Sequence, residues 1–388
     1  MLILGGILLA AAALAFVVTL WNMLAWPGLR DAPPAEAGQV AVLIPARDEE
    51  TTIDGCIQSA LAQGDVVKEV IVYDDHSTDA TASRVRAWTA QDDRVRLCAP
   101  VPLPPGWYGK PFACARLARE ATAPWLLFLD ADARLQPGAV DRVLTEARLR
   151  SATLLAPWPN IVCGGFWEKA LMPLLNFCVF SFFPAPLALR RNDPNLGLAH
   201  GACILVEAAT YRAAGGHAMV RHELFEDTWL ARRWREAGHI GVCLDGDKVV
   251  KVRMYRSFSD IWFGFMKNFR PAFRSEWRFR TFWAFHGVGF LLPFLLLPVA
   301  VWRMDGLPVV AAAALVLASR LLMARRFRHP WWSAALHPLA EGLLLALGVA
   351  SWRRWNSGAG VQWKGRTYRP DQDDGEQPKA AEDPSRVE

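Results

Sequence analysis

The clearest indication of the fold is the stretch Trp125-Leu-Leu-Phe-Leu-Asp-Ala-Asp132. Its apolar run has the length of a buried central strand, and it ends in two carboxylates one residue apart, Asp130 and Asp132. In an open α/β sheet the ligand binds at the carboxyl ends of the strands, so these acids stand where a ligand is expected. Divalent cations such as Mg²⁺ or Mn²⁺ prefer oxygen ligands and usually combine one or two carboxylates with substrate phosphates. The stretch therefore predicts a metal site that holds a phosphorylated donor, although an isolated Asp-x-Asp more often only turns a loop.

Strand-like and helix-like segments alternate from residue 40 onward. Apolar runs predict strands at 40–44, 70–73, 95–98, 126–129 and 153–156. Apolar spacing and capping residues predict helices at about 50–62, 78–90 and 110–120, and a further helix that begins at Pro137. This alternation predicts a Rossmann-like α/β domain with a mostly parallel sheet that is covered on both faces.

The composition indicates a protein that is part soluble and part embedded in a membrane. Of its 388 residues 53% are hydrophobic, including 18 Trp and 20 Phe, whereas 21% are charged. Residues 1–26 carry no charged side chain and are long enough to cross a bilayer, which takes about 20 residues. They lack the basic start of a cleaved signal peptide, so we expect a permanent transmembrane anchor.

Later apolar segments predict further membrane helices. Residues 282–302, 308–323 and 331–352 form a C-terminal transmembrane region, and we expect the last segment to be re-entrant or kinked at Pro338. The apolar, proline-rich segment 166–189 is read either as a helix in the membrane interface or as a buried helix of the soluble core. Arg30 and the basic loop 325–328 place the α/β domain in the cytoplasm by the positive-inside rule, in a multi-pass protein of the inner membrane.

The chain is therefore expected to divide into consecutive parts. These are the anchor at 1–26, the α/β domain at 38–260, an amphipathic interfacial segment at 261–281, the transmembrane region at 282–352, and a cytoplasmic tail at 353–388, first basic and then acidic and disordered. The seven scattered cysteines form no Cys-x-x-Cys and fit a reducing compartment. The cations gather beside apolar segments, which suits membrane lipids with anionic headgroups; no motif supports binding of nucleic acid, and none identifies a protein partner.

Polar residues follow several of the predicted strands. Ile44-Pro-Ala-Arg-Asp-Glu-Glu50 follows the first, Asp74-Asp75-His-Ser-Thr-Asp79 follows the second, and Gly106-Trp-Tyr-Gly-Lys110 precedes a helix whose lysine can meet a phosphate. The carboxyl ends of parallel strands share one crevice, so their acids would repel one another there. A divalent cation with a bound diphosphate would remove this conflict.

Taken together, these motifs resemble the inverting glycosyltransferases of family two, which have the nucleotide-sugar-binding GT-A fold. The matching pieces are 42–50, 74–79, Asp130-Ala-Asp132, Gly201-Ala-Cys-Ile-Leu-Val206 and Glu226-Asp227, and they span about residues 40–243. The segments 254–262 and 363–368 look like membrane-bound members that glycosylate carotenoid acids or other isoprenoid lipids, including hopanoid-associated members.

The resemblance implies roles for individual residues on the donor side. Pro45, Arg47 and Glu49 would line the nucleotide, and Asp75 would contact its base or ribose. Lys110 would approach the donor, while Arg256, Lys267 and Arg366 could close over its diphosphate.

The resemblance also implies the catalytic groups. Asp132, with Asp130, would hold Mg²⁺ or Mn²⁺ and the diphosphate, and Asp227 would be the catalytic base with Glu226 beside it. Taken alone, Glu226-Asp227 would be read as a helix start, because acids favour the first turn.

We therefore expect a metal-dependent glycosyltransferase that moves one sugar, from a donor such as a UDP-hexose, to a lipid or isoprenoid acceptor with inversion. Processive synthases of this family carry Gln-x-x-Arg-Trp after the base, and Arg232-Arg-Trp234 lies too close to Asp227 to match. Three alternatives are a catalytically silent membrane scaffold, a glycosyltransferase that makes a polysaccharide or cell-envelope glycan, and a nucleotidyltransferase. The presence of Asp132 and Asp227 argues against the scaffold, and the lack of a glycine-rich basic loop after the first strand argues against the nucleotidyltransferase.

Overall fold

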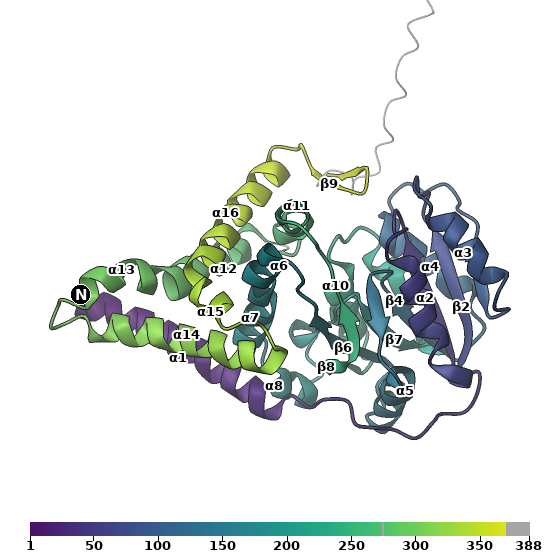
Figure 1. Ribbon diagram of the computed structural model, residues 1–388, viewed down its shortest axis with the longest axis horizontal. Coiled ribbons are helices and arrows are strands. Elements are labelled where there is room, and N and C mark those ends of the chain that lie inside the picture. Colours follow the sequence, from purple (N-terminus) through teal and green to yellow (C-terminus); the bar gives the residue numbers. More distant parts are fainter. Residues whose placement is uncertain (274, 370–388) are drawn as a thin grey trace, which may run out of the picture.

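The structure is a computed structural model that describes residues 1–273 and 275–369. An α/β domain stands beside a set of long helices, and the N-terminus lies at the end of these helices that is farthest from the sheet (Figure 1). Residues 371–388, for which the sequence predicts a disordered acidic tail, lie outside the described residues.

The α/β domain is built on one eight-stranded sheet with the order β3-β2-β1-β4-β7-β6-β8-β5. Its strands are β1 (Val40–Ala46), β2 (Val67–Asp74), β3 (Val95–Cys98), β4 (Trp125–Leu129), β5 (Ala133–Leu135), β6 (Leu154–Ile161), β7 (Cys203–Glu207) and β8 (Gly241–Val252). The run β3-β2-β1-β4 is parallel, as is the pair β6 and β8. The expectation of a mostly parallel sheet is met in this half, whereas β7 is antiparallel to both of its neighbours and β5 is antiparallel to β8.

Helices cover both faces of this sheet. They are α2 (Ile53–Leu61), α3 (Thr81–Thr89), α4 (Gly109–Glu120), α5 (Ala139–Leu149), α9 (Ala208–Ala214) and α10 (Glu226–Glu236), with short 3₁₀ turns η1 (Gly64–Val66), η2 (Pro194–Leu196) and η3 (Gly216–Val220). Successive residues of β1 belong to two different apolar clusters. Val42 and Ile44 lie in one cluster, and Ala41 and Leu43 lie in the other. This is the pattern of a central strand with both faces buried, because side chains alternate across a strand.

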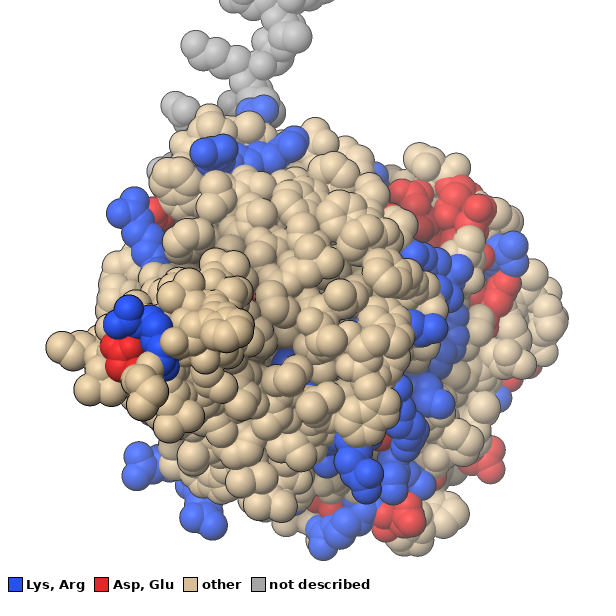
Figure 2. Space-filling model, turned by 60° about the vertical axis from the view of Figure 1, so that its left-hand side comes forward, with Lys and Arg blue, Asp and Glu red and all other residues tan. Residues whose placement is uncertain are grey.

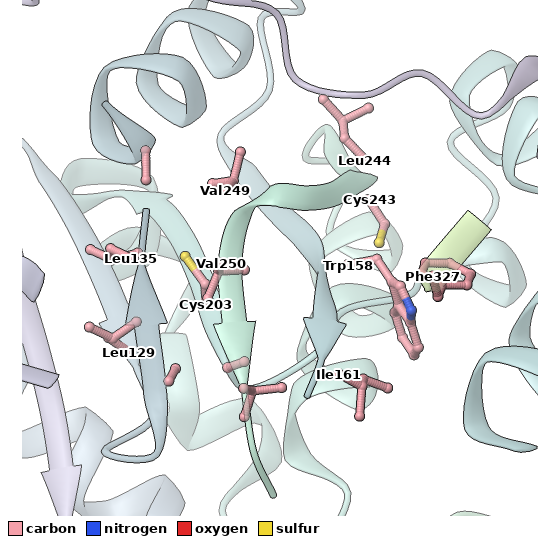
Figure 3. Packing of buried hydrophobic residues seen from close by; sticks show 14 of the residues in the cluster. Leu129, Leu135, Trp158, Ile161, Cys203, Cys243, Leu244, Val249, Val250 and Phe327 are labelled. Atoms are coloured by element: carbon pink, nitrogen blue, oxygen red, sulfur yellow. The ribbon is translucent and has the colours of Figure 1, made fainter. Parts of the chain in front are cut away.

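The first of these clusters continues from the sheet into the long helices. Figure 3 shows part of it, to which β6 contributes Trp158 and α14 (Leu307–Phe327) contributes Phe327. Trp26 donates its indole N–H to the carbonyl of Cys243 at 3.0 Å, and Arg326 forms an ion pair with Asp245. The α/β domain and the long helices therefore share one core.

In the described part of the chain, three continuous helical stretches are long and apolar enough to cross a membrane: 2–25, 276–300 and 307–327. The first is α1 (Leu2–Ala25), the third is α14, and the second joins α12 (Glu276–His286), a π-helical turn η4 (Gly287–Leu291) and α13 (Leu292–Ala300). At Gly5 a Cβ atom would lie 3.1 Å from the Pro308 side chain, so glycine permits the close approach of α1 and α14. Because α12 begins at Glu276, the expected boundary between 281 and 282 falls inside a helix.

The segment 331–352, expected to be a re-entrant or kinked membrane segment, is broken before Pro338, and it is not among the described helices that are long and apolar enough to cross a membrane. Helix α15 (Trp332–Ala335) ends just before α16 (His337–Asn356), which carries Pro338 in its first turn. Helix α11 (Phe258–Phe269) packs against α16. After α16 the chain forms a small hairpin of β9 (Val361–Trp363) and β10 (Arg366–Tyr368), drawn in yellow in Figure 1.

The proline-rich segment 166–189 forms three short helices rather than one. These are α6 (Phe166–Leu171), α7 (Pro173–Phe182) and α8 (Ala185–Arg190), which are separated near Pro173 and Pro184 because proline interrupts a helix. The buried Asn22 of α1 donates to the carbonyls of Phe180 and Phe183 at 2.9 and 2.6 Å and accepts from the amide of Ala185 at 2.9 Å. These bonds fasten the N-terminal helix to this segment.

Candidate active site

The carboxyl ends of the parallel strands open into one cavity of about 760 Å³. Register places Ala46 of β1 beside Asp74 of β2, so the loops that follow both strands start at the same edge. The residues predicted from these loops and from the catalytic motif line the cavity together: Pro45, Arg47, Glu49, Asp75, Lys110, Asp130, Asp132, Glu226, Asp227 and Arg366. Arg256 is not among the described lining residues, since it lies exposed at the start of α11.

Lys110 joins the two acidic motifs. It stands in the first turn of α4, and its Nζ lies 2.8 Å from Asp130 Oδ1 and 2.8 Å from Glu226 Oε1. Although burial opposes its charge, the carboxylates of Asp130 and Glu226 raise the pKa of Lys110 well above its usual value. Burial likewise opposes ionisation of Asp130, but Lys110 lowers the pKa of that carboxyl. This pair therefore remains charged at neutral pH.

Asp227 occupies the start of α10, where it accepts two backbone hydrogen bonds. The donors are the amides of Gly201 at 2.7 Å and of Thr228 at 2.6 Å. Burial, and then the neighbouring Glu226, raise the pKa of Asp227 to about 7. A carboxylate with a pKa near the working pH is suited to act as a general base.

Gly201 is needed because three functional groups meet above its Cα atom. A Cβ there would lie 2.7 Å from Lys110 Nζ, 3.0 Å from Asp130 Oδ2 and 3.5 Å from Asp227 Oδ2. A side chain would displace the ion pair, which gives the physical reason for glycine at this point of the motif.

The acids at the end of β4 fit a metal that arrives with its substrate. Burial, and then the negative charges of Asp130 and Glu49, raise the pKa of Asp132 to about 7. Among the residues that the structure describes, no group of three or more His, Cys, Asp or Glu side chains is arranged to hold a metal. Asp132 and Asp130 fit Mg²⁺ or Mn²⁺ that takes its remaining ligands from a diphosphate.

The β9–β10 hairpin packs against the loops after β1 and β2 at the acidic end of the cavity. Arg366 forms an ion pair with Asp75 through both guanidinium Nη atoms, with one distance of 2.8 Å to Oδ1. Lys364 forms an ion pair with Glu49 and donates to the carbonyl of Arg47 at 2.5 Å. Arg47 in turn donates to the carbonyls of Lys364 and Asp75, at 2.9 and 2.6 Å. The tail hairpin is thereby tied to the loops after β1 and β2.

Lys364 was not predicted from the sequence, although a signal for it exists. Lys364 and Gly365 both have positive φ, 45° and 78°, which is the conformation of a tight two-residue hairpin turn. A Lys-Gly turn between two short strand-like triplets would have placed this lysine at the tip of a hairpin. The partners of the tip are more than 300 residues away in sequence, so no local pattern reveals them.

The other half of the cavity is apolar. Its walls come from α7, α11, α12 and α16, with Leu174, Val179, Phe182, Phe265, Phe269, Phe282, Leu343 and Leu347 among the lining residues. Lys267 of α11 also lines the cavity, and burial lowers its pKa to about 8. The sequence suggested that segment 166–189 grips a lipid or packs in the core; its middle helix α7 supplies cavity wall and packs against α1.

Comparison with known proteins agrees with this geometry. Residues 41–213 match the family described as Glycosyl transferase family 2. The chain is 25% identical over 358 residues to the 4,4'-diaponeurosporenoate glycosyltransferase of Staphylococcus aureus strain USA300, which covers 85% of this chain and 88% of that protein. The protein of the same name from strain MRSA252 is 24% identical over 353 residues, covering 85% of this chain and 88% of that protein.

A solved structure resembles the fold over most of its length. Mannosyltransferase PcManGT from Pyrobaculum calidifontis, in complex with GDP-Man and Mn²⁺, superposes with a TM-score of 0.53 and 18% sequence identity. The match covers 90% of this chain and 98% of that one. At this identity it supports the GT-A-like fold.

Proposed function

The chain is a glycosyltransferase with a family 2 domain at residues 41–213, and from this premise we propose that it transfers one hexose from a nucleoside diphosphate sugar to an isoprenoid lipid. The proposal is carried by one observation: a single cavity has an acid-lined end at the strand termini and an apolar end between α7, α11, α12 and α16. A polar donor and an apolar acceptor would meet where these ends join. The names of the Staphylococcus relatives support a carotenoid-like acceptor.

On the donor side, charged residues would bind and orient the nucleotide sugar. Arg47 and Asp75 lie at the nucleotide end, while Lys110 and Arg366 carry the positive charge that a diphosphate requires. A divalent cation held by Asp132 and Asp130 would neutralise charge on the departing nucleoside diphosphate. We take the donor to be a UDP-hexose.

On the acceptor side, Asp227 would take the proton of the attacking hydroxyl. Its two backbone hydrogen bonds fix the carboxylate, and its pKa of about 7 leaves a large ionised fraction at neutral pH. A single base and a single displacement at the anomeric carbon would invert its configuration. The apolar walls would hold the acceptor chain and exclude water from the reaction.

The surface supports a place in the membrane. Figure 2 shows a broad face with few charged side chains, bordered by a band of Lys and Arg. Such a band is what a protein presents at the level of anionic lipid headgroups. Together with the three long apolar helices, this supports a multi-pass protein of the inner membrane with its α/β domain in the cytoplasm.

The test is a transfer assay on membranes that contain this chain. Membranes are incubated separately with radiolabelled UDP-glucose, UDP-galactose and GDP-mannose, with Mn²⁺ and a lipid extract, and the organic phase is analysed. We expect a radiolabelled lipid in the organic phase from wild-type membranes, and we expect no labelled lipid from membranes that contain Asp227→Asn. Label confined to a water-soluble polymer, or no label from any donor, would contradict the proposal.

A further inference from the structure

His200 occupies the junction between the two ends of the cavity. It directly precedes Gly201, lines the cavity and is 8% exposed. The edge of its ring meets Trp158 of β6, with centroids 5.3 Å apart and planes at 88°. Neither the sequence motifs nor the proposed donor site assigns this histidine a role.

The protonation of His200 follows from its contacts. The amide of Ala202 donates to His200 Nδ1 at 3.1 Å, so Nδ1 is an acceptor and a neutral ring carries its proton on Nε2. Burial lowers the pKa of His200 to about 4, which keeps the ring neutral at physiological pH. Within the part of the chain that the structure describes, Nε2 has no hydrogen-bond partner. Because His200 lines the cavity, this N–H is available to a bound ligand or to water.

The backbone holds His200 close to the proposed base. Gly201 donates its amide to Asp227 Oδ2 at 2.7 Å, and Thr228 Oγ1 donates to the carbonyl of Ala199 at 3.0 Å. Residues 199–201 are therefore fastened to the start of α10 on both sides of the histidine. His200 and Asp227 therefore line the same cavity, and they are joined through the Gly201 amide, which directly follows His200 and bonds to the Asp227 carboxylate.

We propose that His200 binds the head group of the lipid acceptor, with Nε2–H donating a hydrogen bond to its oxygen and so directing the reacting oxygen toward Asp227. This inference rests on the proposed function and deepens it, since it assigns a residue to the acceptor. The head group is an oxygen acceptor of hydrogen bonds that also bears a proton, such as an alcohol or an un-ionised carboxylic acid. An ionised carboxylate would be repelled by Asp227.

The chemical step leaves His200 unchanged. The acceptor oxygen bonds to the anomeric carbon and gives its proton to Asp227. The bond between that carbon and the diphosphate oxygen breaks, and the nucleoside diphosphate leaves with the electron pair. His200 is therefore an acceptor-binding residue that neither gains nor loses a proton.

Two substitutions separate this role from a structural one. In His200→Asn the side-chain oxygen can take the place of Nδ1 and accept from Ala202, but the side chain is too short to reach the position of Nε2. In His200→Gln the side-chain amide carries an N–H close to that position. Both proteins are assayed in detergent micelles with a C20 polyprenol and, separately, with the C20 polyprenoic acid, and their thermal unfolding is compared with that of the wild type.

For the probe that the wild type glycosylates, we expect His200→Asn to lower kcat/KM for the acceptor about 3- to 10-fold, as for loss of one neutral hydrogen bond. Donor affinity and the slow transfer of sugar to water should not change, and His200→Gln should recover most of the loss. Unchanged acceptor kinetics in His200→Asn, an equal loss of transfer to water, or no recovery in His200→Gln would overturn the inference. If the wild type itself labels no lipid, the proposed function fails, which is a separate result.

Discussion

At the scale of single residues, Asp227 sets the expected pH dependence. Its pKa of about 7 means that the carboxylate is mostly protonated at pH 6 and mostly ionised at pH 8, so kcat/KM should rise through this interval and then level off. Asp227→Asn cannot take a proton and should lose about 10²–10⁴-fold in kcat at pH 8, the usual contribution of a general base, and its activity should no longer rise between pH 6 and pH 8. Donor affinity should hardly change. Glu236→Gln, an exposed change on the same helix, is the control, and retained turnover in Asp227→Asn would remove the base assignment.

Asp132 links the site to stability. Its folded pKa of about 7 exceeds the unfolded value of about 3.9, so its favourable contribution is present at low pH and is lost as pH rises through 7. In EDTA, Asp132→Asn should therefore raise Tm by a few degrees at pH 8 and by much less at pH 5. Exposed Asp93→Asn should have no such effect. Asp132→Asn should also lose the Mn²⁺ dependence of donor binding. Equal donor affinity of the wild type with and without EDTA would argue against the metal role.

The residue-level comparison shows what the sequence can reveal. Asp130 and Asp132 were identified because an apolar strand directly precedes them, which is a local signal. His200 and Lys364 were not identified, because their surroundings depend on Trp158 and Glu49, which only the fold brings near them. The raised pKa of Asp227 is likewise a property of tertiary neighbours.

At the scale of elements, the β9–β10 hairpin is expected to control donor binding. Arg366→Ala leaves the Asp75 carboxylate without its ion pair and removes positive charge from the end of the cavity where we propose that the nucleotide sugar binds. The donor KM should rise about 10- to 100-fold, in line with the 1.5–3 kcal/mol typical of a charged hydrogen bond, while kcat should change less. Arg369→Ala, an exposed change just after the hairpin, is the matched control. A donor KM equal to that of the wild type would show that the hairpin does not take part in donor binding.

Helix α7 is expected to limit the length of acceptor that the cavity admits. Val179 lines the apolar end, so Val179→Trp should fill this space and lower transfer to lipid about tenfold or more, while sugar transfer to water persists. Leu149→Trp, on the exposed side of α5, tests for a general effect of the larger side chain. Assays with short and long polyprenols give the readout. Equal activity of Val179→Trp on both would place the acceptor elsewhere.

The elements themselves were predictable where one rule governs them. Strands β1 to β4 and the helices between them follow from apolar runs and caps, and they fall within a few residues of the prediction. The reversed direction of β7 was not predictable, since an apolar run does not encode its orientation in a sheet. Strand β8 was also missed, because charged residues interrupt its pattern from Asp245 to Lys251.

At the scale of the whole molecule, the long helices and the α/β domain form one unit. Asn22, Trp26 and Arg326 connect α1 and α14 to α7, α8 and β8 by buried or partly buried bonds. The cavity lies where these two parts meet, so under the proposed function the long helices would contribute to the acceptor wall in addition to anchoring the protein. The anchor and the span around 307–327 were evident from hydropathy, whereas their packing against the site was not.

Deletion of residues 1–26 tests this arrangement. Because the stretches 276–300 and 307–327 remain, the shortened protein should stay in the membrane fraction after an alkaline carbonate wash. It should nevertheless be less stable, since the deletion removes Asn22 and uncovers the apolar faces of α7 and α14. Asn22→Leu separates the two effects: it keeps the anchor but leaves the carbonyls of Phe180 and Phe183 without their donor, which should lower stability by about 1–3 kcal/mol. Unfolding is followed by protease resistance in micelles. A fully soluble shortened protein would refute the C-terminal spans, and unchanged protease resistance in both variants would show that α1 does not support the acceptor wall.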